Sequence, residues 1–257
     1  MRQLLIPRLP DDAERYEATG EDFHYLAHVL RVREGASVPA GDKDGGRYRL
    51  TLERREKERL VFSVRRETAE PEGRSGPDLT LFMCLPKPVK MDLIIRMAVE
   101  VGVSRIVPVA SAHGAVGEKE IPRLEDRVER WRKIARAAFQ QSGRRDPPAV
   151  GSIIPFSGIV PAAKLRLFAD ERGGLPLHEA LGERTPERID VLVGPEGGLA
   201  DGERRALADK GFVPIHLGKN ILRTETAAVV VCAAVLLVES ERTSWKPTYI
   251  KKSATTS

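Results

Sequence analysis

The chain has 257 residues, of which 41% are hydrophobic and 31% charged, a balance typical of a globular protein with one large domain or two smaller ones. Its net charge of +5 is mild, so overall charge does not by itself identify a partner. The longest apolar run, Ala227–Val238, has twelve residues, which is too few to cross a bilayer and predicts a buried helix.

The ends and the cysteines predict a cytoplasmic protein that does not contact a membrane. The apolar character of the first residues stops at Pro7, so we expect no signal peptide. Cys84 and Cys232 lie far apart in apolar segments, which predicts reduced thiols in the core.

Residues 1–70 predict a small β-rich module. The segment Asp22–Val32 has helical spacing of its apolar residues and is followed by Gly35. Short alternating runs then predict strands, separated by Gly/Asp turns, at 36–40, 47–52 and 59–64. Residues 71–78, rich in Pro, Gly and Ser, predict a linker.

From Leu79 onward, strands alternate with helices, which predicts an α/β domain over 79–245 with a mainly parallel sheet. The polar residues 246–257 predict a flexible tail. The expected strands are Leu79–Leu85, Arg105–Ala110, Lys164–Ala169, Ile189–Val193 and Phe212–His216. The expected helices before the apolar run are Lys90–Val101, Pro122–Gln141, Leu177–Leu181 and Gly202–Lys210, the last with Asp201 as a possible cap.

Basic residues concentrate in one part of this domain. Residues 123–146 contain eight Arg or Lys against four Asp or Glu. Clustered arginine is typical of a surface that binds a phosphate backbone, but a solvated helix face is the more frequent explanation of such a run.

Several common site motifs are absent. The chain has no Gly-x-Gly-x-x-Gly after the first strand of the α/β part, no P-loop and no Gly-x-Ser-x-Gly elbow, which disfavours a dinucleotide fold, an NTPase and a serine hydrolase. His24 and His28 have a spacing that can chelate a metal, but no Cys or acidic partner matches them, so a structural or RNA-facing role is favoured. We therefore expect no metal.

Two turns near the C-terminus carry the strongest signal. Gly194–Gly198 and Leu217–Thr226 each follow an apolar strand and each lead into a helix. Glycines allow close approach of the backbone to a ligand, and the amides that open a helix are free to bind one. The first turn alone is equally consistent with a tight turn, but in the second Arg223 and Glu225 have no evident structural purpose. These turns therefore predict a ligand site.

With these motifs the chain resembles the SPOUT methyltransferases, and within them the family that methylates N3 of a uridine in small-subunit ribosomal RNA. The resemblance covers nearly the whole chain. It rests on the segments His24–Arg31, Lys90–Val103, Trp131–Ile134 with Gln141–Arg144, Val193–Gly198 and Leu217–Ala227. The chain departs from the family pattern at Gln140, at Ser111-Ala112-His113 and at Arg96.

The resemblance implies a C-terminal domain with a deep trefoil knot and an N-terminal PUA-like barrel that binds RNA. It also implies S-adenosylmethionine as cofactor, 16S ribosomal RNA or the small ribosomal subunit as partner, and a homodimer with the apolar C-terminal helix in the interface. The implied cofactor-binding residues are Phe168, Ala169, Val193, Gly194, Gly197, Gly198, Leu217, Gly218, Ile221, Leu222, Arg223, Thr224 and Ala227.

The chemistry of an imide nitrogen nominates the catalytic residues. The acceptor must lose a proton, and the resulting anion needs a nearby cation. Arg223 suits that role and cannot be the base, because guanidinium stays protonated. Glu196 and Glu225 are the nearby carboxylates, and we take Glu196 as the candidate proton acceptor. The expected RNA-binding residues, besides the basic face of 122–141, are Arg2, Arg8, His28, Arg31, Arg33, Arg144 and Arg145.

Two other functions are compatible with parts of the sequence. Another SPOUT enzyme could methylate a ribose 2′-oxygen or a guanine nitrogen, which the two turns alone would not exclude. A non-catalytic RNA-binding assembly factor could share the fold, although the intact Arg223 and glycine turn argue against it. An acyl-transfer or nucleotide enzyme is disfavoured because the chain lacks a nucleophile constellation.

Overall fold

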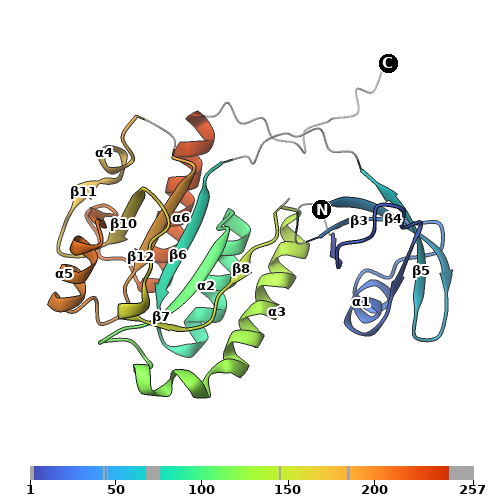
Figure 1. Ribbon diagram of the computed structural model, residues 1–257, viewed down its shortest axis with the longest axis horizontal. Coiled ribbons are helices and arrows are strands. Elements are labelled where there is room, and N and C mark those ends of the chain that lie inside the picture. Colours follow the sequence, from blue (N-terminus) through green and yellow to red (C-terminus); the bar gives the residue numbers. More distant parts are fainter. Residues whose placement is uncertain are drawn as a thin grey trace.

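The computed structural model describes residues 3–42, 44, 46–67, 76–144, 146–183 and 186–242. Figure 1 shows two parts, a small N-terminal β domain and a larger C-terminal α/β domain. Most of the predicted linker and the whole predicted tail lie outside the described residues.

The N-terminal domain is built on a five-stranded sheet in the order β1-β3-β4-β5-β2. Alternate residues of β4 are buried, as the two-residue period of a half-buried strand requires. Its core contains Leu26, Tyr48 and Phe62. The strands are β1 (Leu4–Leu5), β2 (Arg15–Ala18), β3 (Ser37–Gly41), β4 (Arg47–Arg55) and β5 (Leu60–Arg66).

The helix predicted over Asp22–Val32 is present but changes type within its length. It begins as α1 (Gly20–His24) and continues as a π-helical turn, Tyr25–Val29. Arg31 then adopts φ 52°, a left-handed conformation that is uncommon for a residue with a side chain. The wide turn and the strained residue after it are features often found at functional sites.

The C-terminal domain contains an eight-stranded sheet in which every pair is parallel. Its path runs β11-β13-β10-β12-β6-β7-β8, and β9 pairs with β7. The strands are β6 (Asp78–Cys84), β7 (Arg105–Ala110), β8 (Ala149–Val150), β9 (Ile154–Pro155), β10 (Leu165–Ala169), β11 (Leu175–Pro176), β12 (Arg188–Val193) and β13 (Val213–His216). The predicted α/β class with a mainly parallel sheet is therefore confirmed.

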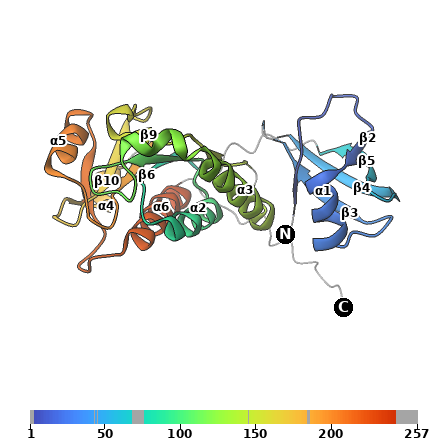
Figure 2. The same ribbon diagram turned by 90° about the horizontal axis from the view of Figure 1, so that it is seen from below.

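Both faces of this sheet are covered. On β6, Leu81 packs with the helices of one face, whereas Phe82 belongs to the apolar layer under the other. Figure 2 shows α2, α3 and α6 together on the first face. The opposite layer includes Leu207 of α5 and Phe156 of a short 3-10 turn. The helices are α2 (Pro88–Val101), α3 (Glu125–Ser142), α4 (Leu177–Leu181), α5 (Asp201–Asp209) and α6 (Thr224–Arg242).

Several helix starts differ from the prediction, among them those of α3 and α5. The helix expected from Pro122 begins at Glu125, because Pro122 belongs to a separate 3-10 turn, Glu118–Arg123. The proposed cap Asp201 is wrong: its carboxylate pairs with Arg172 at 2.6 Å. Instead, Glu203 Oε2 accepts the Ala200 amide hydrogen at 2.9 Å, which satisfies a donor at the start of α5.

Hydrogen bonds from α3 connect the two domains. The Gln3 amide, just before β1, donates to the Gln140 carbonyl near the end of α3 at 2.9 Å. The Arg136 guanidinium donates to Asp22 Oδ1 at 2.6 Å and to the Leu5 carbonyl at 2.9 Å. Tyr16 donates to the other oxygen of Asp22 at 2.7 Å. These contacts place the N-terminal domain against α3.

Candidate functional site

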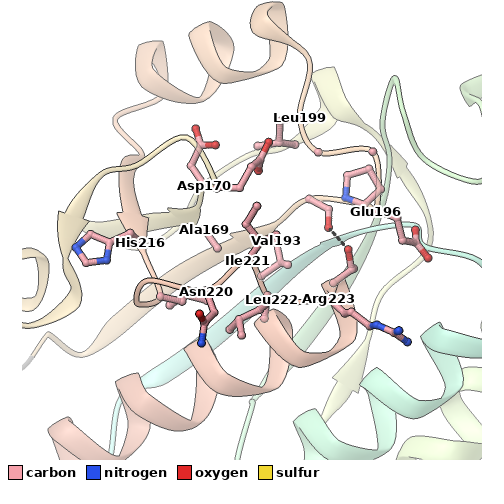
Figure 3. A pocket seen from close by; sticks show the side chains of 18 of the residues that line it. Ala169, Asp170, Val193, Glu196, Leu199, His216, Asn220, Ile221, Leu222 and Arg223 are labelled. Atoms are coloured by element: carbon pink, nitrogen blue, oxygen red, sulfur yellow. Dashed lines mark hydrogen bonds between the residues drawn. The ribbon is translucent and has the colours of Figure 1, made fainter.

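A cavity of about 520 Å³ lies where three loops leave the carboxyl ends of the adjacent strands β10, β12 and β13 (Figure 3). This edge of a parallel sheet is where α/β proteins usually bind ligands. The lining residues are Lys90, Ala169, Asp170, Glu171, Val193, Gly194, Pro195, Glu196, Gly197, Gly198, Leu199, His216, Leu217, Gly218, Lys219, Asn220, Ile221, Leu222, Arg223, Thr224 and Ala227.

The two glycine-rich turns singled out in the sequence form most of this lining. All of the predicted cofactor-binding residues except Phe168 are among its members, and so is Glu196. Phe168 does not line the cavity: its side chain is buried in the apolar layer on the α5 side of the sheet. In a strand, neighbouring side chains point to opposite faces, so Phe168 and Ala169 cannot both face the ligand.

Steric contacts explain why glycine stands at both of the last two positions of the first turn, Gly197 and Gly198. Gly198 has φ 68°, and a Cβ there would lie 2.7 Å from Glu171 Oε1. Gly197 lacks a left-handed φ, but a Cβ would lie 2.9 Å from Cβ of His113. A side chain at either position would force its neighbour or the loop to move, so this turn needs glycine at both positions.

The departure at Ser111-Ala112-His113 lies against the first turn. His113 Nδ1 is 3.1 Å from the Gly197 carbonyl and 3.3 Å from that of Gly198, a contact that forms a hydrogen bond when Nδ1 carries the proton. The Ala112 amide donates to Glu203 Oε1 at 2.8 Å. The segment Ser111-Ala112-His113 therefore packs against the first turn and the start of α5.

Arg204 of α5 holds the loop after β10. Its guanidinium donates to Asp170 at 2.8 and 3.0 Å and to Glu171 Oε1 at 2.8 Å. Burial alone would raise the pKa of the Asp170 carboxyl, but hydrogen bonds from Arg204 and from the Arg172 amide lower it below its ordinary value. Asp170 is therefore ionised, and the loop is anchored from outside the cavity.

Lys90, in the first turn of α2, is a site residue that the sequence analysis missed. Its Nζ lies 3.1 Å from Glu196 Oε1 and 2.9 Å from Glu225 Oε2. Ion pairing with Glu225, and then with Glu196, raises the Lys90 pKa. The available signal was indirect: the two glycine-rich turns carried two carboxylates, and the cation that they share lies more than one hundred residues away in the sequence.

The two glutamates are held ionised. Hydrogen bonding to Lys90 lowers the Glu225 pKa. Burial alone would raise the Glu196 pKa, but hydrogen bonds from its own amide, from Lys90 and from the Lys87 amide lower it. A carboxylate with a lowered pKa is a weak base, so the structure does not favour Glu196 as the proton acceptor.

Arg223 and Thr224 lie near the end of the second turn, where α6 begins. The Thr224 hydroxyl is 3.4 Å from the Gly194 carbonyl, which links the start of α6 to the first turn. Arg223 is exposed, and in Figure 3 its side chain points away from Ala169 and Val193. The cation is thus at the rim of the cavity.

The predicted RNA-binding residues fall into two groups, with Arg2 and Arg145 outside the described residues. In the N-terminal domain, His28, Arg31 and Arg33 are exposed and line a shallow hollow of about 740 Å³. Arg55 joins them from the end of β4 and was not predicted. Arg8 is also exposed, with Asp44 at 3.9 Å.

Arg144 has an internal role instead. Its guanidinium donates to the carbonyls of Val99, Gly102 and Val103 at 3.0, 3.3 and 2.8 Å, at the C-terminal end of α2. These donors satisfy acceptors that a helix end leaves without partners. Arg144 is therefore placed to hold α2 and is not directed at a bound RNA.

The basic side chains of α3 also have partners in the fold. Arg130 pairs with Asp92 at 2.5 Å, and Arg132 pairs with Glu129. Two more reach the N-terminal domain: Arg136 pairs with Asp22 at 2.6 Å, and Lys133 pairs with Glu21 at 3.3 Å. Much of the expected phosphate-binding face is thus occupied by ion pairs, two of which join the domains.

The described residues show neither a metal-binding cluster nor a membrane-spanning helix. They contain no group of three or more His, Cys, Asp or Glu residues that could hold a metal ion. None of their helices combines the length and apolarity needed to cross a membrane.

Comparison with known proteins agrees with this geometry. Residues 74–236 match the RNA methyltransferase domain family, and residues 18–65 match the RNA methyltransferase PUA domain family. The ribosomal RNA small subunit methyltransferase E of Mycobacterium bovis is 31% identical, with 91% of each chain covered. The chain belongs to this methyltransferase family. The relative from Bacillus subtilis, with the same name, is 28% identical over 88% of this chain and 91% of its own length.

A solved structure of the same family shares the fold. The enzyme from Neisseria gonorrhoeae, crystallised bound to S-adenosyl methionine, superimposes with a TM-score of 0.81 at 28% identity. The superposition covers 93% of this chain and 98% of the other. The similarity therefore extends through both domains.

Proposed function

We propose that this protein transfers a methyl group from S-adenosylmethionine to N3 of a uridine in 16S ribosomal RNA. The observation that carries the proposal is the cavity formed by the loops after β10, β12 and β13, with the two sequence-predicted turns as its walls. Membership of the family and a SAM-bound family member support the donor and the class of RNA.

The residues around the cavity fit the methyl donor. A volume of about 520 Å³ is within the range of small-molecule sites, which is roughly 300–1,000 Å³. Leu217, Leu222 and Ala227 offer apolar surface, while the glycine turns expose backbone groups. When bound, S-adenosylmethionine supplies an electrophilic methyl group on a sulfonium, so the protein has to align the two reactants and needs no group that activates the donor.

We propose the same architecture as in SPOUT enzymes, a trefoil knot around this site. The chain leaves β12, forms α5, adds β13 beyond β10, and then returns past β10 and β12 to α6. Helix α6 then packs against β12, β6 and α2. This path supports threading of the last segment through an earlier loop.

In this proposal the uracil imide loses its proton to solvent water, and Arg223 stabilises the anion that forms. The negative charge spreads over the neighbouring carbonyl oxygens, which a guanidinium at the rim can reach. Glu196 is assigned to positioning, because its carboxylate already accepts from Lys90 and from the Lys87 amide at 3.3 Å.

RNA binding is assigned to the N-terminal hollow formed by His28, Arg31, Arg33 and Arg55. Three arginines and a histidine around one concave surface are suited to binding a phosphate backbone. The Glu34 carboxylate accepts the Arg55 amide hydrogen at 2.9 Å and so fixes one wall of the hollow. Replacing Arg31 and Arg33 by Ala should lower both the affinity for 16S RNA and its dependence on salt. An unchanged salt slope would contradict this assignment.

We also propose a homodimer in which α6 meets its copy. Val230 and Leu237 of this helix are 39% and 62% exposed, although residues of its other face, such as Val231, are fully buried. A second copy of the chain would remove this apolar surface from water. Leu237→Glu should shift the protein to a monomer in analytical ultracentrifugation, whereas an unchanged sedimentation coefficient would contradict the interface.

The proposed activity is tested with Arg223→Ala. The variant should bind S-adenosylmethionine in calorimetry but lose most methylation of small subunits from a deletion strain, measured by mass spectrometry of RNA digests. Arg205→Ala, on the exposed side of α5, is the matched control and should retain activity. Absence of donor binding by the wild type would refute the enzyme function, and near-normal turnover of Arg223→Ala would refute the role of Arg223.

A further inference from the structure

One side chain on α2 links the two cofactor turns. Lys90 Nζ lies 3.1 Å from Glu196 of the first turn and 2.9 Å from Glu225, at the end of the second turn and in the first turn of α6. The side chains of Lys90, Glu196 and Glu225 are 26%, 30% and 17% exposed. The cluster is thus partly shielded, and its pairing is screened less than that of a surface pair.

The helix that carries Lys90 is held firmly. Met91, Ile94 and Ile95 are fully buried under the sheet, and Arg144 binds the carbonyls at the other end of α2. Pro88 at the start of the helix has a preset φ that suits this position. Lys90 therefore projects from a rigid support toward the first turn and the start of α6.

Lys90 is the cation that both carboxylates share. Both carboxylates are ionised, and they lie within about 6 Å of one another because each is about 3 Å from the same nitrogen. Without the ammonium, Glu196 and Glu225 would repel and separate the first turn from the start of α6. Glu196 would keep its hydrogen bonds from the Lys87 amide at the helix start and from its own amide.

We propose that Lys90 is a positioning residue of the methyl-transfer site. It sets the spacing between the Gly194–Gly198 turn and the start of α6, and so fixes both the width of the donor cavity and the place of Arg223. The inference rests on the proposed function and adds to it a residue that acts through Glu196 and Glu225.

Lys90→Met tests this directly. We expect the variant to bind S-adenosylmethionine at least about 10-fold more weakly, because a small displacement of a site loop has effects of this size or larger. The KM for the donor should rise more than kcat falls. Lys90→Arg keeps the charge and should recover part of the affinity. Lys87→Met is the matched control: Lys87 is exposed and contacts Glu196 only through its backbone amide, so affinity should not change.

A triple variant separates positioning from catalysis. Lys90→Met combined with Glu196→Gln and Glu225→Gln removes the repulsion as well as the cation, so donor affinity should return to within about 3-fold of the wild type, with measurable turnover. Wild-type affinity in Lys90→Met would overturn the proposal, and so would a triple variant that binds the donor but is inactive. A wild type that fails to bind the donor would instead refute the function itself.

Discussion

Arg144 offers a test in which two interpretations of one arginine predict opposite results. Sequence reasoning places it among the RNA contacts, whereas the structure directs its guanidinium to the carbonyls of Val99, Gly102 and Val103. Arg144→Ala removes these donors and leaves the end of α2 without them. The same helix carries Lys90 at its other end, so its position affects the site as well as the core.

The cost can be estimated from the contacts. Hydrogen bonds from a charged donor contribute about 1.5–3 kcal/mol each, and such contributions are not additive within one group. The two shorter bonds, at 3.0 and 2.8 Å, suggest a total of about 3 kcal/mol. A loss of this size lowers Tm by roughly 6–12 °C in a protein of this length.

Urea unfolding and RNA binding should be measured on the same variants. We expect Arg144→Ala to lose stability without a change in the salt slope of 16S RNA binding. The control Arg127→Ala, at an exposed position of α3, should stay within about 0.5 kcal/mol of the wild type. An Arg144→Ala variant of wild-type stability, with a salt slope reduced by about one, would refute the structural role and restore the RNA contact.

Three further predictions concern the site and the domain contact. Gly198→Ala should weaken donor binding about 10-fold in calorimetry, because φ is 68° and the new Cβ would meet Glu171, whereas Gly202→Ala, which has open space, should be neutral or slightly stabilising. Hydrogen bonding to Lys90 lowers the pKa of the Glu225 carboxyl, so this carboxylate stabilises the fold fully above its ordinary pKa and loses that effect as the pH falls through the lowered pKa. In thermal unfolding the wild type should therefore be more stable than Glu225→Gln at pH 7, and this difference should disappear in strong acid. A stability difference that persists in strong acid would contradict the prediction. Asp22→Ala removes the acceptor that Tyr16 and Arg136 share, so hydrogen exchange of the Gln3 amide at the domain contact should become at least about 10-fold faster. Glu21→Ala loses only an exposed ion pair with Lys133 and should leave this exchange rate unchanged.

The sequence was sufficient for the longer strands and helices of the α/β domain and for the place of the site, but it missed the short strands β1, β2, β8, β9 and β11. Strand β7 and helix α4 have the predicted bounds, because apolar period and flanking turn residues are local properties of the chain. The two glycine-rich turns were also correctly assigned to one cavity. The carboxyl ends of parallel strands meet at one edge of the sheet, so consecutive strand–helix turns converge there.

Only the tertiary structure decided which charged groups meet. Lys90 is more than one hundred residues from both of its glutamate partners, and Asp22 is as far from Arg136. Spacing along the chain carries no information about such pairs, because they depend on how separate helices pack on the sheet. The same packing assigned Arg144 to a helix end and turned Phe168 away from the cavity, since a residue's partners are set by the face on which it lies and not by its type.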